Sequence, residues 1–283
     1  MGTEKVSLMY SPLRLAGKYF RYYLTAANGK GHGVHSPFVF DFVTHVLNDR
    51  RIYAEYAPIE MLRSRLSGDT GVLPIEDLGA GSVSGAGTQR RVLDIVRRSA
   101  KPQRLGRLLF RMARHYRPGV MVELGTSLGL STAYLAAGAG LDRAEGEAGA
   151  PGSRLYTIEG SAALAEAAAG NLRSLGLDAR IVTGNFDDEL APLLQTIPPV
   201  DLAFIDGNHR YEPTMRYFES LFAHASPGAV LIFDDIYWSG EMERAWEDIR
   251  RDPRVMLTID LFFLGFVFIR EEFRVKQDFT IRF

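Results

Sequence analysis

The sequence predicts an α/β fold in which a mainly parallel sheet ends in a C-terminal antiparallel hairpin, after a mainly helical N-terminal cap. Beyond residue 118, short β-branched apolar runs alternate with helical segments, the pattern of a parallel sheet covered by helices. The last two runs are joined by a link too short for a helix, so they must pair antiparallel. We therefore expect a cap over residues 1–100 and a sheet domain over residues 101–283.

In this sheet domain, each expected strand except the last two is followed by a helix. The expected strands are residues 120–124, 154–158, 180–183, 201–205, 229–233, 255–259 and 266–270. The helices after the first five strands are expected at residues 131–137, 162–175, 188–195, 212–225 and 241–251. Residues 139–153 are rich in Gly, Ala and Glu and are predicted to form a loop insertion.

The first 118 residues have a less regular pattern. Helices are expected at residues 13–24, 38–47, 90–98 and 104–116, and residues 67–89 are expected to form a long loop. A glycine-rich loop with His32 and His35 separates the first two helices. The fourth helix carries an apolar face and, opposite it, a stripe formed by Arg104, Arg107, Arg111 and Arg114. That stripe is expected to be solvated or to pair with the acidic domain that follows it; a functional stripe would indicate an anionic acceptor.

Composition excludes several classes of protein. The 283 residues include no cysteine, which excludes disulfides and thiolate metal sites. No apolar run approaches the ~18 residues that a spanning helix needs, and no secretory signal is recognised, so we expect a cytoplasmic protein. Residues 1–118 carry 19 basic and 9 acidic side chains, whereas residues 119–283 carry 14 and 25. Possible partners of the basic part are the acidic part of the chain, an anionic substrate, a lipid or a nucleic acid.

Polar motifs follow the strands where ligands of open α/β sheets bind. The first strand ends in Glu123-Leu124-Gly125-Thr126-Ser127-Leu128-Gly129-Leu130-Ser131, where glycines permit a tight turn and the helix N-terminus favours a carboxylate. Glu159 ends the second strand, 36 residues later, and is suited to accept hydrogen bonds from ribose hydroxyls. Asn185 and Phe186 follow the third strand and suit an adenine ring, and Asp206 follows the fourth.

The segment 123–131 resembles the glycine-rich motif of class I S-adenosylmethionine-dependent methyltransferases, with their Rossmann-like sheet, and its form is similar to the catechol O-methyltransferase group. The resemblance covers about residues 104–270. It implies S-adenosylmethionine (SAM) as cofactor and transfer of its methyl group to a small hydroxylated acceptor. The implied cofactor-binding residues are Glu123, Gly125, Thr126, Ser127, Gly129, Ser131, Glu159, Asn185, Phe186 and Asp206.

A second glycine motif, Asp77-Leu78-Gly79-Ala80-Gly81-Ser82, is a closer copy of the cofactor loop when taken alone. Pro74 disfavours a strand before it, and further glycines follow where a helix should begin. We therefore expect a flexible segment here and place the cofactor at residues 123–131.

Three carboxylates are expected to meet at the ends of the fourth and fifth strands: Asp206, Asp234 and Asp235. They would repel one another unless a cation joined them, and oxygen ligands suit Mg²⁺. The resemblance to metal-dependent catechol and natural-product sugar O-methyltransferases implies that these three residues bind metal. It also implies that His209, three residues after Asp206, is the general base.

Other readings stay open at the level of sequence. The methyltransferase could work without metal, and Asp206, Asp234, Asp235 and His209 could serve only local structure. A nucleic-acid methyltransferase would use the basic N-terminal part, although no Asn/Asp-Pro-Pro-Tyr/Phe signature is present. An NAD-dependent oxidoreductase needs a glycine where Ser127 stands. A non-catalytic binding protein and a homo-oligomer are also compatible with the sequence.

Overall fold

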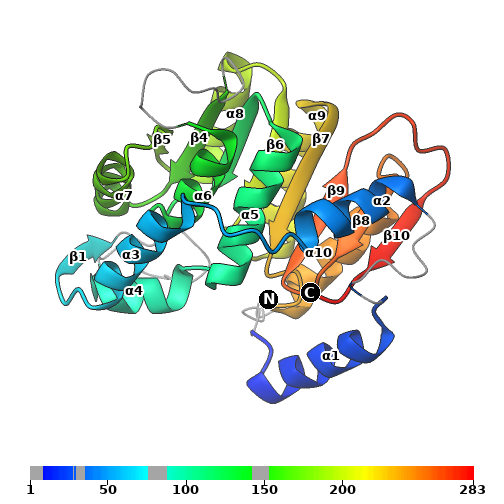
Figure 1. Ribbon diagram of the computed structural model, residues 1–283, viewed down its shortest axis with the longest axis horizontal. Helices are drawn as coiled ribbons and strands as arrows, with labels where there is room; N and C mark the ends of the chain where they lie inside the picture. Colours follow the sequence, from blue (N-terminus) through cyan, green and yellow to red (C-terminus); the bar gives the residue numbers. More distant parts are fainter. Residues whose placement is uncertain (1–8, 28, 30–35, 76–87, 142–152) are drawn as a thin grey trace, which may run out of the picture. The chain divides into compact units, whose positions relative to one another are not determined.

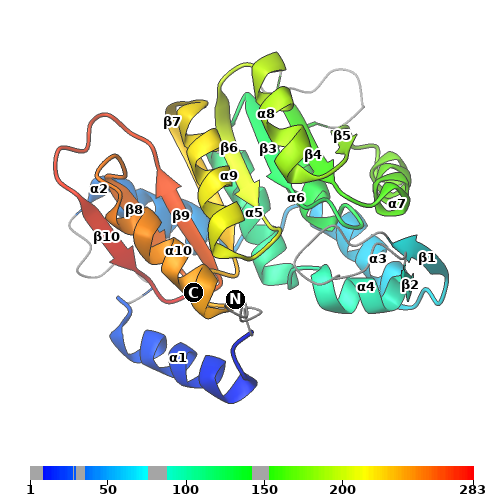
Figure 2. The same cartoon turned by 180° about the vertical axis from the view of Figure 1, so that it is seen from behind.

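A computed structural model describes residues 9–27, 29, 36–75, 88–141 and 153–283, which fold into two compact units (Figures 1 and 2). The first unit combines Met1–Leu47 with Pro199–Phe283, and the second is Asn48–Pro198. The second glycine motif at residues 77–82, His32, His35 and most of the expected insertion lie outside the described residues. In the part that is described, no helix has the length and apolarity needed to cross a membrane.

The second unit contains three parallel strands at its centre, as predicted. They are β3 (Val120–Leu124), β4 (Arg154–Glu159) and β5 (Arg180–Thr183). Val122 of β3 lies opposite Tyr156 of β4, which lies opposite Arg180 of β5. Every residue of β3 is buried, which explains why an uninterrupted apolar run encodes it.

Four helices accompany these strands close to their predicted positions. They are α5 (Gln103–Tyr116), α6 (Leu130–Ala139), α7 (Ala162–Ser174) and α8 (Phe186–Thr196). Helices α5 and α6 approach each other through glycine. A Cβ atom on Gly106 would lie 2.3 Å from the ring of Tyr134, and one on Gly138 would lie 2.3 Å from the carbonyl oxygen of Phe110. Neither position accepts a side chain without movement of its neighbours.

Part of the arginine stripe of α5 lies against α3 (Tyr56–Ser67). Arg107 forms an ion pair of 2.6 Å with Glu60, and Arg114 lies 3.7 Å from Glu55 at the start of α3. Arg104 and Arg114 are exposed, as expected of a solvated stripe, whereas Arg107 is half-buried and Arg111 is buried, because a helix that the sequence did not reveal covers part of this side of α5.

The long loop expected at residues 67–89 also needs correction. It contains β1 (Val72–Ile75) and leads into β2 (Thr88–Arg91), and the two form an antiparallel ribbon. Pro74 pairs in register with Gln89. A two-stranded ribbon has only edge strands, where a residue without an N–H group is tolerated. Helix α4 (Val92–Ser99) follows directly.

The first unit contains the remaining strands. They are β6 (Val200–Ile205), β7 (Ala225–Asp234), β8 (Leu257–Asp260), β9 (Leu264–Phe268) and β10 (Gln277–Thr280). Strands β6 and β7 are parallel, whereas β9 pairs antiparallel with both β7 and β8. The predicted C-terminal hairpin is therefore confirmed. Strand β10, parallel to β8, was not predicted because its sequence is short and largely polar.

Helical segments complete the described part of this unit (Figure 1). They are α1 (Pro12–Thr25), α2 (Pro37–Asp41), a π-helix η1 (Phe42–Leu47), α9 (Tyr211–Ala223) and α10 (Gly240–Arg251). The helix expected at residues 38–47 is thus split into an α and a π segment. Helix α10 packs on the sheet through Trp246, whose ring lies 2.7 Å from the position that a Cβ atom on Gly265 would take.

The contact between α5 and α6 generates a stability prediction. Gly138→Ala places a methyl group against the Phe110 backbone, so we expect it to lower the free energy of unfolding by about 1–3 kcal/mol. Gly170→Ala is the control, because a Cβ there meets no atom closer than 3.9 Å. Removing a helical glycine should then raise stability by roughly 0.5–1 kcal/mol. Urea denaturation measures both variants, and equal effects would contradict this packing.

Candidate functional site

The loop after β3 combines left-handed backbone with a helix start. The φ angles of Gly125, Ser127 and Gly129 are 105°, 48° and 80°. Gly129 is the N-cap of α6 and provides no side chain to cap it, while Ser131 lies in the first helical turn. A Cβ on Gly129 would also lie 3.3 Å from the Cβ of Ala168 in α7. The loop therefore presents helix N–H groups near its glycines, an arrangement suited to a carboxylate.

Glu123, at the end of β3, forms hydrogen bonds that stabilise this loop. It is fully buried, and its Oε2 accepts hydrogen bonds from the hydroxyls of Thr132 in α6, at 2.5 Å, and Thr157 in β4, at 2.7 Å. The Thr157 hydroxyl also lies 2.6 Å from that of Thr126. Burying a carboxylate is costly unless it is hydrogen-bonded. These contacts give Glu123 a role within the fold, as the group that joins β3, β4 and the start of α6.

Glu159, the last residue of β4, lies beside the same loop. It is buried, with 8% of its surface exposed. Its Oε2 accepts a hydrogen bond of 2.7 Å from the backbone N–H of Ser127, and its Oε1 accepts one of 3.0 Å from that of Ser161. Burial raises the pKa of Glu159 above its usual value, although these backbone N–H groups oppose the shift. A carboxylate offers about four acceptor positions, so this group can accept further hydrogen bonds from hydroxyls.

Asn185 and Phe186 stand at the start of α8. The Asn185 side chain accepts a hydrogen bond of 3.1 Å from the Asp187 N–H and caps the helix. The backbone N–H of the preceding Gly184 donates to the Glu159 carbonyl oxygen at 2.9 Å. The predicted adenine-binding pair thus follows directly on the residue that joins the ends of β4 and β5.

Ser99 is a neighbour of the loop that sequence reasoning missed. Its hydroxyl lies 2.8 Å from the Ser127 hydroxyl and also donates to the Ile95 carbonyl oxygen. Ser99 ends α4, 28 positions before Ser127. A serine at a helix end carries no sequence signal for such a contact.

The other predicted residues gather in the first unit. Asp206, His209 and Asp234 each offer a ligand atom within 4.8 Å of the other two, and this is the group of possible metal ligands found among the described residues. His209 Nε2 lies 3.6 Å from Asp206 Oδ1. Asp234, the last residue of β7, is almost fully buried. Asp235 is not part of this group, and its backbone N–H donates to the Phe263 carbonyl oxygen at 2.8 Å.

Left-handed backbone accompanies this acidic cluster. Asn208, His209 and Asp235 have φ angles of 65°, 31° and 52°. Such conformations cost free energy for residues with a side chain and tend to occur at functional sites. The two carboxylates and the imidazole are donors that a divalent cation accepts, with carboxylate oxygens preferred by Mg²⁺. The donor set therefore fits the metal that the sequence suggested.

Comparison with known proteins finds similarity to methyltransferases. Residues 122–236 match the family model of a methyltransferase domain. A catechol O-methyltransferase of Mycobacterium tuberculosis is 32% identical over 125 residues, which are 42% of this chain and 49% of that protein. The chain spans less than half the length of the curated relatives it matches.

Two solved structures extend the likeness in fold over most of the chain. PaMTH1, a methyltransferase of Podospora anserina bound to S-adenosylhomocysteine (SAH), has a TM-score of 0.56 at 14% identity, over 94% of this chain and 99% of that one. An O-methyltransferase from Bacillus cereus in complex with SAH has a TM-score of 0.50 at 22% identity, over 82% and 97%. Residues 122–236 therefore resemble a methyltransferase domain, and most of the chain shares the fold of these two methyltransferases.

Proposed function

We propose that this protein transfers the methyl group of SAM to a hydroxyl of a small acceptor. The observation that carries the proposal is the buried Glu159 carboxylate at the end of β4, held 2.7 Å from the Ser127 N–H of a glycine-rich loop. The sequence match to a methyltransferase domain and the O-methyltransferase relatives support the same chemistry. Both solved structures compared above hold SAH in their own sites.

The cofactor would be held by residues of the second unit. Glu159 would accept hydrogen bonds from the ribose hydroxyls, while the backbone of Gly125, Thr126 and Ser127, with Ser131, would hold the methionine end. Asn185 and Phe186 would flank the adenine. SAM supplies an activated methyl group, so this part of the protein has to bind and orient the sulfonium. Fixing donor and acceptor in one geometry contributes much of the rate in such reactions.

The first unit would supply the acid–base chemistry. Asp206 and Asp234 would hold a divalent cation, whereas Asp235, a third ligand in the prediction from sequence, lies outside the group of possible ligands. Such a cation, when bound, favours the ionised form of an acceptor hydroxyl. His209 would take the hydroxyl proton, since histidine is the most frequent general base in enzymes and Asp206, 3.6 Å away, would stabilise the resulting imidazolium. Asp206 is also the residue of this cluster predicted to lie near the cofactor.

The role of Glu159 generates the first test. Glu159→Gln should weaken SAH binding by about 10- to 100-fold, because hydrogen bonds to a charged group contribute about 1.5–3 kcal/mol. Isothermal titration calorimetry measures the change. Glu166→Gln removes an exposed carboxylate from α7 of the same unit and should leave the affinity unchanged. Equal affinities of the Glu159 variant and wild type would reject the proposed ribose contact.

The raised pKa of Glu159 predicts a pH dependence. In the ligand-free protein this shift favours the protonated carboxyl, so its contribution to stability is present below pH 4.5, the ordinary pKa, and is lost as the pH rises through the raised value. Ribose hydroxyls instead donate to the ionised form. SAH affinity of the wild type should therefore increase as the pH rises above 4.5, and Glu159→Gln should lack this component. Calorimetric titrations in a pH series test this, and identical pH profiles would contradict it.

Adjacent aspartates provide the metal test. We expect Mg²⁺ to bind the wild type and to lose its calorimetric signal in Asp234→Asn, which removes a carboxylate from the cluster. Asp235→Asn, the matched control one residue later, should retain Mg²⁺ binding because Asp235 is not part of that group. Loss of Mg²⁺ binding in Asp235→Asn but not in Asp234→Asn would identify Asp235 as the metal ligand instead. Absence of Mg²⁺ binding by the wild type would remove the metal and leave the SAM prediction intact.

A further inference from the structure

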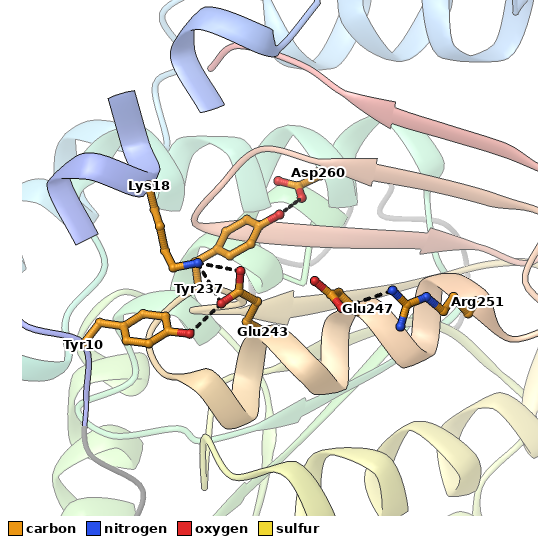
Figure 3. A network of polar contacts seen from close by, with 7 residues as sticks. All are labelled: Tyr10, Lys18, Tyr237, Glu243, Glu247, Arg251 and Asp260. Atoms are coloured by element: carbon orange, nitrogen blue, oxygen red, sulfur yellow. Dashed lines mark hydrogen bonds and ion pairs between the residues drawn. The ribbon is translucent and has the colours of Figure 1, made fainter. Parts of the chain in front are cut away.

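Helix α1 is fastened to its unit along one side (Figure 3). Lys18 Nζ lies 2.6 and 2.8 Å from the two carboxylate oxygens of Glu243 in α10, and the Tyr10 hydroxyl donates to the same group at 2.6 Å. Tyr22 donates to the Ile281 carbonyl oxygen. Hydrogen bonds from Lys18 and Tyr10 outweigh burial and lower the pKa of Glu243. This side of α1 is therefore held in place at neutral pH by an ionised carboxylate.

Aromatic packing completes the attachment. The ring centroids of Tyr19 and Tyr22 lie 5.0 and 5.3 Å from that of Phe262, which stacks on Tyr237 at 5.1 Å. Tyr237 in turn donates to Asp260 at 2.7 Å. The inner side of α1 is thus satisfied by contacts within its own unit, and its orientation in that unit is fixed.

The opposite side of α1 is apolar and exposed. Leu13, Phe20 and Leu24 have exposed fractions of 85%, 63% and 61%. Their separations of seven and four residues place them on one helical stripe, about 16 Å long at 1.5 Å per residue. Scattered apolar residues are normal on a surface, but an aligned stripe usually marks an interaction site.

Positive charge borders this stripe. Arg14 and Arg21 are exposed and follow Leu13 and Phe20 on the helix, so they lie together along one margin. Tyr23 lies along the other margin, with the Arg282 guanidinium 4.8 Å from its ring centroid. Helix α1 contains no acidic residue. An apolar stripe between arginines, with an aromatic residue at its edge, is the composition of helices that lie in a membrane surface.

We propose that α1 binds the surface of a membrane that contains anionic lipids, with its axis parallel to the surface. Leu13, Phe20 and Leu24 would enter the boundary of the acyl chains, and Arg14 and Arg21 would contact lipid phosphates. A second copy of the chain is a less suitable occupant of this stripe. Symmetric pairing would place an identical arginine-bordered helix opposite α1 and bring like charges together.

Vesicle flotation of the full-length protein tests this proposal. We expect binding to vesicles of phosphatidylcholine with phosphatidylserine, and weaker binding to phosphatidylcholine alone. Phe20→Ser with Leu24→Ser should reduce binding at least about tenfold, given the apolar surface removed. Arg21→Gln should reduce it about fivefold and weaken its dependence on salt.

Matched controls lie outside α1. Phe40→Ser, at an exposed phenylalanine of α2, and Arg98→Gln, at an exposed arginine of α4, should bind vesicles as the wild type does. Circular dichroism verifies that each variant is folded. Absence of wild-type binding, or equal binding by the α1 variants and controls, would overturn the proposal. A wild-type dimer in light scattering that Phe20→Ser with Leu24→Ser converts to a monomer would assign the stripe to a second copy instead.

Discussion

The second unit depends on burying two carboxylates at the ends of neighbouring parallel strands. Glu123 has no exposed surface, so threonine hydroxyls from β4 and α6 must stabilise it. Glu159, one strand along, accepts the Ser127 N–H and thereby holds the glycine loop against β4. The same contacts that satisfy buried charge therefore fix the loop shape. The fold and the proposed cofactor site therefore depend on the same contacts, so we expect a change at either glutamate to affect both.

The two glutamates illustrate different uses of the same chemical group. Hydroxyls from two elements donate to Glu123, which gives it a structural role, whereas Glu159 receives backbone N–H groups at the loop itself. Burial raises the pKa of Glu159, so ionising this carboxyl in the ligand-free protein costs free energy. A ligand that donates hydroxyl hydrogen bonds would offset that cost. A site that is destabilising when empty and satisfied when filled is typical of binding sites.

Most of the sheet could be predicted because parallel strands that are buried on both faces are continuous apolar runs. The run at residues 120–124 matches β3, which is buried throughout, at both ends. Strand β10 and the ribbon containing Pro74 were missed because edge strands need no apolar run and tolerate proline. The partners of α5 were missed for a different reason. Whether Arg107 faces solvent or Glu60 depends on a helix 47 positions away, and helical periodicity does not encode such contacts.

The candidate site was predictable to a similar degree. Strand ends gave the positions of Glu159, Asp206 and Asp234, because side chains at those ends face ligands. Sequence could not distinguish Asp234 from Asp235, since it does not reveal that the backbone turns left-handed at Asp235, directly after β7. The most direct test of the account is a crystal structure of the protein with SAH. The proposed function predicts that the ribose hydroxyls donate to the Glu159 carboxylate and that the homocysteine carboxylate lies at the loop after β3. SAH bound elsewhere, or no SAH bound at saturating concentration, would contradict it.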